Sequence, residues 1–158
     1  MDERKVTVSN CNTIKKKHKS IHAPYEYFKY EAVEDDDKNK LVALIYEIPP
    51  NKENYPYHYH LNNEEVFYII SGQGILKTPD GEKKIKAGDI IYCPANEKSA
   101  HKLINTSHKE NLVYFECDTN MYPDVTYYPE SNKVGILCDD GKNTFYKIDS
   151  NVDYFEGE

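Results

Sequence analysis

Two histidines stand one residue apart in the segment YPYHYHLNNEEVFYIISGQG, residues 55–74. Successive side chains of a β-strand point to opposite faces, so in a strand His58 and His60 would share one face with Cα atoms about 6.6 Å apart. Two imidazoles at that spacing can converge on one metal ion held about 2.1 Å from each nitrogen. The alternative is that both histidines are exposed on a polar edge and bind no metal. The histidine pair by itself does not decide between these two interpretations.

The residues that follow the histidine pair add further candidate ligands. Glu64 and Glu65 open an apolar segment, and either carboxylate could supply an anionic ligand at the entrance of a strand. The alternation of side chains groups Glu65 with Phe67 in a core-facing row and leaves Glu64 on the outer face, which favours Glu65. Downstream, His101 follows a loop that begins with a proline and starts another short apolar segment.

Short apolar segments separated by turn residues make up the chain from residue 41 onward. The segments LVALIYEI, EVFYIIS, GDIIYCP, NLVYFECD and KVGILCD each suit one strand. Residues 79–81 (PDG) predict a hairpin turn, and residues 139–143 (DDGKN) predict a second one. No helical period persists for three turns in this part of the chain. The pattern therefore predicts an all-β sandwich or barrel.

Composition limits the classes of function. The chain has 158 residues, which suits one domain, and a net charge of −7, which argues against nucleic acid as a partner. No apolar run reaches the roughly 20 residues needed to cross a membrane, and no apolar leader is visible at the N-terminus. The four cysteines are far apart and form no C-x-x-C pair. These features predict a cytoplasmic protein with reduced thiols that binds neither nucleic acid nor membranes.

Two segments of the chain resemble the two motifs of the cupin superfamily. The matching residues are His58, His60, Glu65 and Gly72 in the first motif, and Gly88, Pro94, His101 and Asn105 in the second. With its flanking strands, the resemblance covers residues 41–118, about half of the chain. The loop PANEKSAH is longer than the usual second motif and is similar to that of a subgroup of small bacterial cupins with no established reaction.

The resemblance implies a fold and a metal site. The fold is a double-stranded β-helix, the jelly-roll cupin barrel, with residues 1–40 as an N-terminal arm with edge strands, 41–120 as the barrel core and 121–158 as a C-terminal β extension of the same domain. The implied cofactor is one divalent metal ion, with the ligands His58, His60, Glu65 and His101. A set of nitrogen and oxygen ligands without thiolate suits Fe, Mn, Ni, Co or Zn.

Two positions depart from the cupin pattern. Asn51 and Asn96 stand where the motifs have glycine. Asparagine is the residue other than glycine that best tolerates the left-handed region of φ and ψ, so we expect both turns to be kept.

The motifs indicate a function only by class. We expect a metal-dependent enzyme that acts on a small polar substrate, an oxyanion or a carbonyl compound, by oxygenase or isomerase chemistry. The alternative is a non-catalytic module that binds or senses a small molecule. Catalysis needs an acid or base beyond the metal ligands, and the nearest candidates by sequence are Tyr46, Tyr92, Glu97 and Ser99, none of which we assign as catalytic.

The expected partners are a small-molecule ligand and a second copy of the chain. A barrel of this kind leaves edge strands open, and residues 21–40 form an aromatic-rich segment that could add to a sheet of the neighbouring subunit. These two features predict a homodimer.

Overall fold

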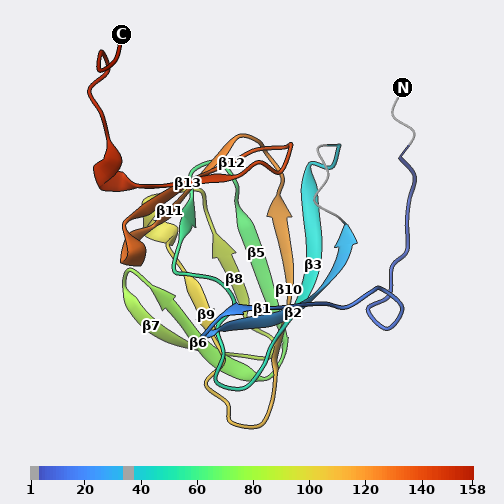
Figure 1. Cartoon of the computed structure of the whole chain (residues 1–158). Helices are drawn as coiled ribbons and strands as arrows, with labels where there is room; N and C mark the ends of the chain where they lie inside the picture. Colours follow the sequence, from blue (N-terminus) through green and yellow to red (C-terminus); the bar gives the residue numbers. More distant parts are fainter. Residues whose placement is uncertain (1–3, 34–37) are drawn as a thin grey trace.

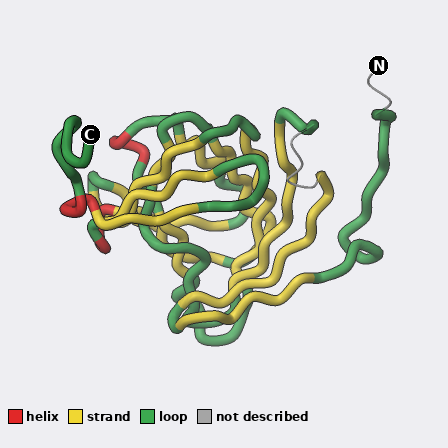
Figure 2. Tube along the Cα trace, turned by 45° about the horizontal axis from the view of Figure 1, so that its top comes forward, coloured by secondary structure: helices red, strands yellow, loops and turns green. Residues whose placement is uncertain are grey.

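The computed structural model describes residues 4–33 and 38–158, which form an all-β chain with no α-helix in those ranges (Figures 1 and 2). The strands are β1 (Lys17–His22), β2 (Tyr25–Val33), β3 (Leu41–Ile48), β4 (Tyr59–His60), β5 (Glu65–Ser71), β6 (Gln73–Thr78), β7 (Gly81–Lys86), β8 (Ile90–Cys93), β9 (Lys102–Ile104), β10 (Leu112–Thr119), β11 (Asp124–Tyr128), β12 (Lys133–Leu137) and β13 (Thr144–Lys147). The 3-10 turns are η1 (Glu97–Ser99), η2 (Pro129–Ser131) and η3 (Ile148–Ser150). Within the described ranges, no helix has the length and apolar character that crossing a membrane requires.

Three sheets enclose the barrel. The largest has the strand order β1-β2-β3-β10-β5-β8, and the other two have the orders β13-β12-β11-β4 and β7-β6-β9. Figure 1 shows β3, β10, β5 and β8 side by side as one wall. Strand β10 runs antiparallel to both β3 and β5 in the middle of that wall. This is the jelly-roll barrel that the motifs implied.

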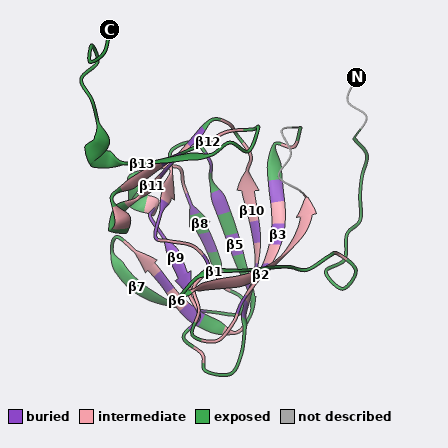
Figure 3. Cartoon of the chain, viewed as in Figure 1, coloured by how far each residue is buried: buried purple, intermediate pink, exposed green. Residues whose placement is uncertain are grey.

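Buried residues alternate with exposed ones along β5 and with half-buried ones along β3 and β10 (Figure 3). On β5, Glu65, Phe67 and Ile69 are buried, as the alternation predicted. On β10 the inward row contains Tyr114 and Glu116. The apolar core is therefore interrupted by carboxyl groups at one end of the barrel, where β5 begins and β10 ends.

The predicted hairpins are both present. Residues 79–80 join β6 to β7, and residues 138–143 join β12 to β13. Asn51 has a φ of 59°, so it occupies the left-handed region as expected. The same expectation was wrong for Asn96, whose φ of −168° is extended. Its side-chain oxygen instead accepts a hydrogen bond from the backbone N–H of Lys98 and caps η1.

The N-terminal aromatic segment finds its partner within the chain. Strands β1 and β2 form a hairpin, and β2 pairs with β3 of the same large sheet. The other end of the chain behaves differently, because residues 151–158 extend away from the barrel beyond η3 (Figure 1).

The asparagine of the second motif closes the far end of the barrel. Asn105 is fully buried, and its side-chain amide donates to the backbone carbonyls of Ile48 and Glu110, both at 2.8 Å. Its side-chain oxygen accepts from the backbone N–H of Ser107 at 2.9 Å. A buried amide with all these partners locks the loop before β10 to the end of β3.

Candidate metal centre

A backbone bridge places two of the four predicted ligands side by side. The N–H of His101 donates to the carbonyl of His58 at 2.8 Å, and the N–H of His58 donates to the carbonyl of His101 at 3.2 Å. Directly opposed residues of an antiparallel pair present their side chains on the same face. The two imidazole rings consequently lie with centroids 4.8 Å apart, although 43 positions separate them in sequence.

The second histidine of the pair lies on β4, which pairs with β11. There His60 stands opposite Thr126, and its Nδ1 is hydrogen-bonded to the carboxylate of Asp124. Burial alone would lower the pKa of His60, but the Asp124 hydrogen bond and the Glu65 carboxylate outweigh it and raise that pKa. Asp124 itself is fully buried and also accepts from the backbone N–H of Asn62 and the side-chain amide of Asn63.

The structure distinguishes the two glutamates. Glu65 is buried at the start of β5, with Oε2 3.1 Å from His101 Nε2 and Oε1 3.7 Å from His60 Nε2. Glu64 is exposed and accepts a hydrogen bond from the hydroxyl of Tyr92 at 2.9 Å. The inward residue is therefore Glu65, as the alternation favoured.

Three of the four predicted ligands form one compact group. The ligand atoms of His58, Glu65 and His101 all lie within 4.8 Å of one another, and all three residues are buried. His60 lies at the edge of this group, where its Nε2 is 3.7 Å from Oε1 of Glu65. The three-residue group could hold a metal ion; the four-residue set that includes His60 stays a prediction.

The tautomers of the three histidines suit a metal. His58 Nδ1 donates to the carbonyl of Pro56 at 2.8 Å, and His101 Nδ1 donates to the carbonyl of Ser99 at 3.0 Å. With the His60–Asp124 bond, each imidazole has its Nδ1 engaged, which leaves Nε2 as the nitrogen that can bind an ion. Burial and the two neighbouring histidines hold the pKa of His58 well below its usual value, so it is neutral, as a metal ligand must be. The donor set fits a divalent metal.

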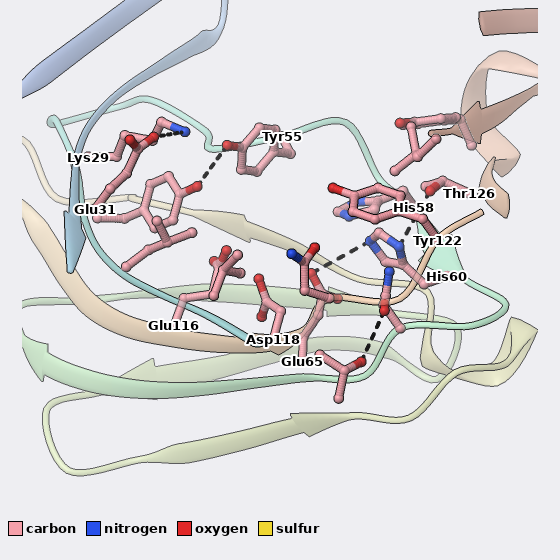
Figure 4. A pocket seen from close by; sticks show the side chains of 18 residues that line it. Lys29, Glu31, Tyr55, His58, His60, Glu65, Glu116, Asp118, Tyr122 and Thr126 are labelled. Atoms are coloured by element: carbon pink, nitrogen blue, oxygen red, sulfur yellow. Dashed lines mark hydrogen bonds and ion pairs between the residues drawn. The ribbon is translucent and has the colours of Figure 1, made fainter. Parts of the chain in front are cut away.

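A cavity of about 280 Å³ opens beside this group (Figure 4). Two further carboxyl groups line it, those of Glu116 and Asp118, which lie two residues apart on the inward row of β10. Burial first, and then the charge of Asp118, hold the pKa of Glu116 well above its usual value. Burial and the Glu65 carboxylate raise the pKa of Asp118 to about 7. The interaction between the two side chains raises the pKa of Glu116 further and lowers that of Asp118, so the two act as a carboxyl pair in which Glu116 is the group that holds the proton more tightly.

Sequence reasoning missed this carboxyl pair and offered other candidates. Of those, Tyr46 lines the cavity, with its hydroxyl 2.9 Å from the hydroxyl of Tyr55. Tyr92 lies on the outer face of β8, more than half exposed. Glu97 and Ser99 belong to η1 and do not line this cavity. Alternation along β10 puts both carboxyls on one face, but only the structure shows that this face is the inner one.

Residues 44–117 match a family model described as a cupin domain. The chain contains a cupin domain. A segment of 49 residues is 45% identical to an uncharacterized protein of Methanocaldococcus jannaschii; this match covers 30% of the chain and only 37% of that relative.

Solved structures share this fold, two of them over nearly the whole chain. A structure from Silicibacter pomeroyi, named a sugar phosphate isomerase from a cupin superfamily, has a TM-score of 0.82 at 15% identity. The match covers 95% of this chain and 98% of that one. A protein of Acidithiobacillus ferrooxidans has a TM-score of 0.78 at 23% identity, covering 94% of each chain. A predicted oxalate decarboxylase of Thermotoga maritima has a TM-score of 0.61 at 20% identity, covering 73% of this cupin and 100% of that chain. At these identities the likeness concerns the fold alone.

Proposed function

We propose that this cupin is a metal-dependent enzyme of the isomerase type, which moves a proton between neighbouring carbons of a small carbonyl compound. The observation that carries this proposal is the Glu116–Asp118 carboxyl pair, which lines the same cavity as His58, His60 and Glu65 (Figure 4). A perturbed pair of titratable groups in a cleft is the arrangement that acid–base catalysis uses.

The metal in this proposal is held by His58, Glu65 and His101, with His60 as the fourth ligand. A divalent ion bound by these side chains would supply positive charge that polarises a carbonyl oxygen of the substrate. The ligand atoms carry nitrogen and oxygen only, which leaves Fe, Mn, Ni, Co and Zn as the candidate ions. The chain supplies one carboxylate and three imidazoles, so an octahedral ion would keep two positions for the substrate.

The carboxyl pair supplies the proton transfers. Asp118, with a pKa of about 7, accepts a proton from the carbon next to the carbonyl, and Glu116 holds the proton that the pair returns to the neighbouring carbon. The hydroxyl proton on the carbon that loses its hydrogen passes to the carbonyl oxygen, so each proton removed is replaced and the bonding electrons stay in the substrate. The reaction therefore consumes no oxidant, and this is why the pair favours an isomerase over the oxygenase that the sequence left open.

The fold comparison supports the same class of reaction. The Silicibacter pomeroyi structure that covers almost the whole chain is named a sugar phosphate isomerase. Isomerisation of a sugar is a proton transfer between adjacent carbons of a carbonyl compound, which is the chemistry argued here from the residues.

Hydrogen exchange in heavy water tests the proposal and separates it from the alternative, a module that only binds a small molecule. Metal-loaded protein is incubated in D₂O with a mixture of small aldoses, ketoses and hydroxy acids and followed by NMR and mass spectrometry. We expect deuterium to enter one compound at the carbon next to its carbonyl, and the isomer of that compound to appear.

Matched variants identify the catalytic groups. Asp118→Asn and Glu116→Gln should each lower the exchange rate by at least about 100-fold, because general acid–base catalysis contributes roughly 10²–10⁴-fold. His108→Ala, at an exposed residue in a loop outside the cavity, should leave the rate unchanged. Recovery of every compound without deuterium, with each of the five metals supplied, would contradict the enzyme and support the binding module.

A further inference from the structure

The charges around the cavity set a condition on its substrate. Four carboxyl side chains and one lysine line the cavity, and among the described residues no arginine lines it. The carboxyl groups are Glu31, Glu65, Glu116 and Asp118, and the lysine is Lys29. In Figure 4, Lys29 and Glu31 lie at one end, His58 and His60 at the other, and Glu116, Asp118 and Glu65 between them.

The single lysine of the cavity is already paired. Lys29 Nζ lies 2.6 Å from Glu31 Oε1, and both side chains are mostly buried, with 22% and 13% of their surfaces exposed. The other oxygen of Glu31 pairs with Lys17, which is more exposed and does not line the cavity. Arginine, the side chain best suited to bind phosphate in a bidentate manner, occurs once in the chain, as Arg4, whose guanidinium donates to the backbone carbonyl of Lys38.

The rest of the polar lining suits hydroxyl groups. Neutral amide and hydroxyl side chains line the cavity, among them Asn120, Tyr122, Thr126 and Tyr128. Carboxylates accept hydrogen bonds from sugar hydroxyls, and amides and hydroxyls both donate and accept. A volume of about 280 Å³ is small for a ligand pocket and suits a compound of monosaccharide size.

The same cavity is unfavourable for a phosphate group. It carries a charge of about −1.5 to −2 at pH 7 and needs several strong donors. A divalent ion and Lys29 together bring three positive charges, which the carboxylates of Glu31, Glu65 and Asp118 balance while Glu116 holds its proton, so the cavity offers no surplus positive charge. An unpaired anion inside such a site is rejected, because like charges repel most strongly where water is excluded.

We infer that the cavity takes a neutral polyhydroxylated carbonyl compound, an unphosphorylated sugar by chemical class, and that it discriminates against the phosphate ester of the same compound. The inference rests on the proposed function, whose substrate it narrows. It also separates this cupin from the Silicibacter pomeroyi protein, whose name specifies a sugar phosphate.

Binding to matched ligand pairs tests the inference without turnover. Zn²⁺-loaded protein is titrated by calorimetry and ligand-observed NMR with D-fructose, D-mannose and D-ribose, and with their terminal phosphate esters. We expect at least one neutral sugar to bind, and its phosphate ester to bind at least about tenfold more weakly.

Two variants probe the reason for the discrimination. Glu31→Gln removes the carboxylate that neutralises Lys29, so binding of the phosphate ester should tighten by about tenfold while binding of the neutral sugar changes little. Glu47→Gln is the matched control, because Glu47 forms a similar lysine pair with Lys16 but does not line the cavity, and it should leave both affinities unchanged. Thermal unfolding confirms that each variant is folded.

The outcomes separate the inference from the proposed function. A phosphate ester that binds as tightly as its neutral sugar, or failure of all three neutral sugars to bind, overturns the inferred substrate class. Neither result touches the proposed function, which the deuterium experiment with its wider mixture of carbonyl compounds decides. If Glu31→Gln is folded and leaves phosphate binding unchanged, the lysine pair is not the cause of the discrimination and the charge argument fails.

Discussion

His60 Nδ1 donates a hydrogen bond to the carboxylate of Asp124, a residue 64 positions further along the chain. Asp124 has no exposed surface, and burial alone would raise its pKa. The hydrogen bond from His60 and those from Asn63 and Asn62 outweigh burial and lower that pKa, so the carboxylate is charged. A charged acceptor fixes the tautomer of His60 and turns Nε2 toward Glu65, which is how a carboxylate commonly orients a metal-binding histidine.

Replacement of Asp124 should therefore weaken metal binding without removing a ligand. In Asp124→Asn the side chain loses its charge and offers His60 a weaker acceptor. We expect the affinity for Zn²⁺ or Mn²⁺ to fall by about 10–100-fold, the usual effect of losing such a partner. Calorimetry on the metal-free protein measures this, with Asp80→Asn in the exposed turn between β6 and β7 as the control.

The ligands themselves are tested by the same titration. His58→Ala, Glu65→Gln and His101→Ala should each lower metal affinity more strongly than Asp124→Asn, because each removes a member of the compact group. His60→Ala decides whether the group has a fourth member. Binding by His60→Ala at wild-type affinity would restrict the site to three protein ligands and would also make the orienting role of Asp124 untenable.

Asp118 should make the metal-free protein less stable as the pH rises. Its pKa is raised from 3.8 to about 7, so the folded protein binds this proton more tightly than the unfolded chain does. The resulting stabilisation is complete below pH 3.8 and is lost as the pH rises through about 7. Each pKa unit corresponds to about 1.4 kcal/mol, so the full effect amounts to a few kcal/mol.

A difference between variants isolates this effect from other titrations. The free energies of unfolding of wild type and Asp118→Asn are measured by urea denaturation from about pH 4.5 to 7.5. The variant lacks the ionising group, so it should gain stability relative to wild type at the higher pH. A difference that stays constant over this range would show that Asp118 titrates normally.

Gly72 should be far less tolerant of alanine than Gly81. Both have a positive φ, 81° and 107°, but a Cβ on Gly72 would lie 2.3 Å from the backbone oxygen of Asn111, whereas no atom lies within 4 Å of one on Gly81. Gly81→Ala should cost about 1–2 kcal/mol for its conformation alone. Gly72→Ala should cost at least about 3 kcal/mol, since a backbone overlap is added. Equal losses in urea denaturation would contradict this account.

The sequence could predict those parts of the site that depend on local spacing. The histidine pair, the orientation of Glu65 and the hairpin at residues 79–81 each follow from the alternation of side chains or from turn chemistry. Asp124 could not be found in this way, because it reaches His60 only through the pairing of β4 with β11, and nothing in its neighbouring residues indicates chemistry.

The inward position of the carboxyl pair of β10 could not be predicted from the sequence for a different reason. One row of side chains on β10 ends in two carboxyl groups, whereas the row with Val113 and Phe115 contains no charged residue. Burial favours apolar rows, so the pattern alone points to that row as the inner one. In the structure Tyr114 and Glu116 face inward, and Phe115 lies on the outer face of the sheet. The sheet consequently keeps an apolar outer surface.

That outer surface offers a different basis for a homodimer from the edge strands and residues 21–40 on which the sequence prediction rested. Val66, Tyr68 and Ile70 of β5 are exposed beside β8, where 72% of Ile90 and 57% of Tyr92 are exposed. Strand pairing makes the surface continuous, because Tyr68 is opposite Ile90 on β8 and opposite Phe115 on β10. Exposed apolar patches of this kind mark interaction surfaces, and a stable dimer needs about 800 Å² on each partner.

Disruption of this face should therefore produce a monomer. The N-terminal hairpin occupies the edge of β3 in its own chain, so the expected contact lies at the β5–β8 face rather than at that edge. We expect wild type to sediment as a dimer at tens of micromolar and the double variant Tyr68→Glu with Ile90→Glu to sediment as a monomer, because four charges would be buried per interface. Val152→Glu, at an exposed apolar residue of the C-terminal segment, should leave the dimer intact. A wild-type monomer would refute the homodimer, and a dimer that survives the double variant would move the contact to another surface.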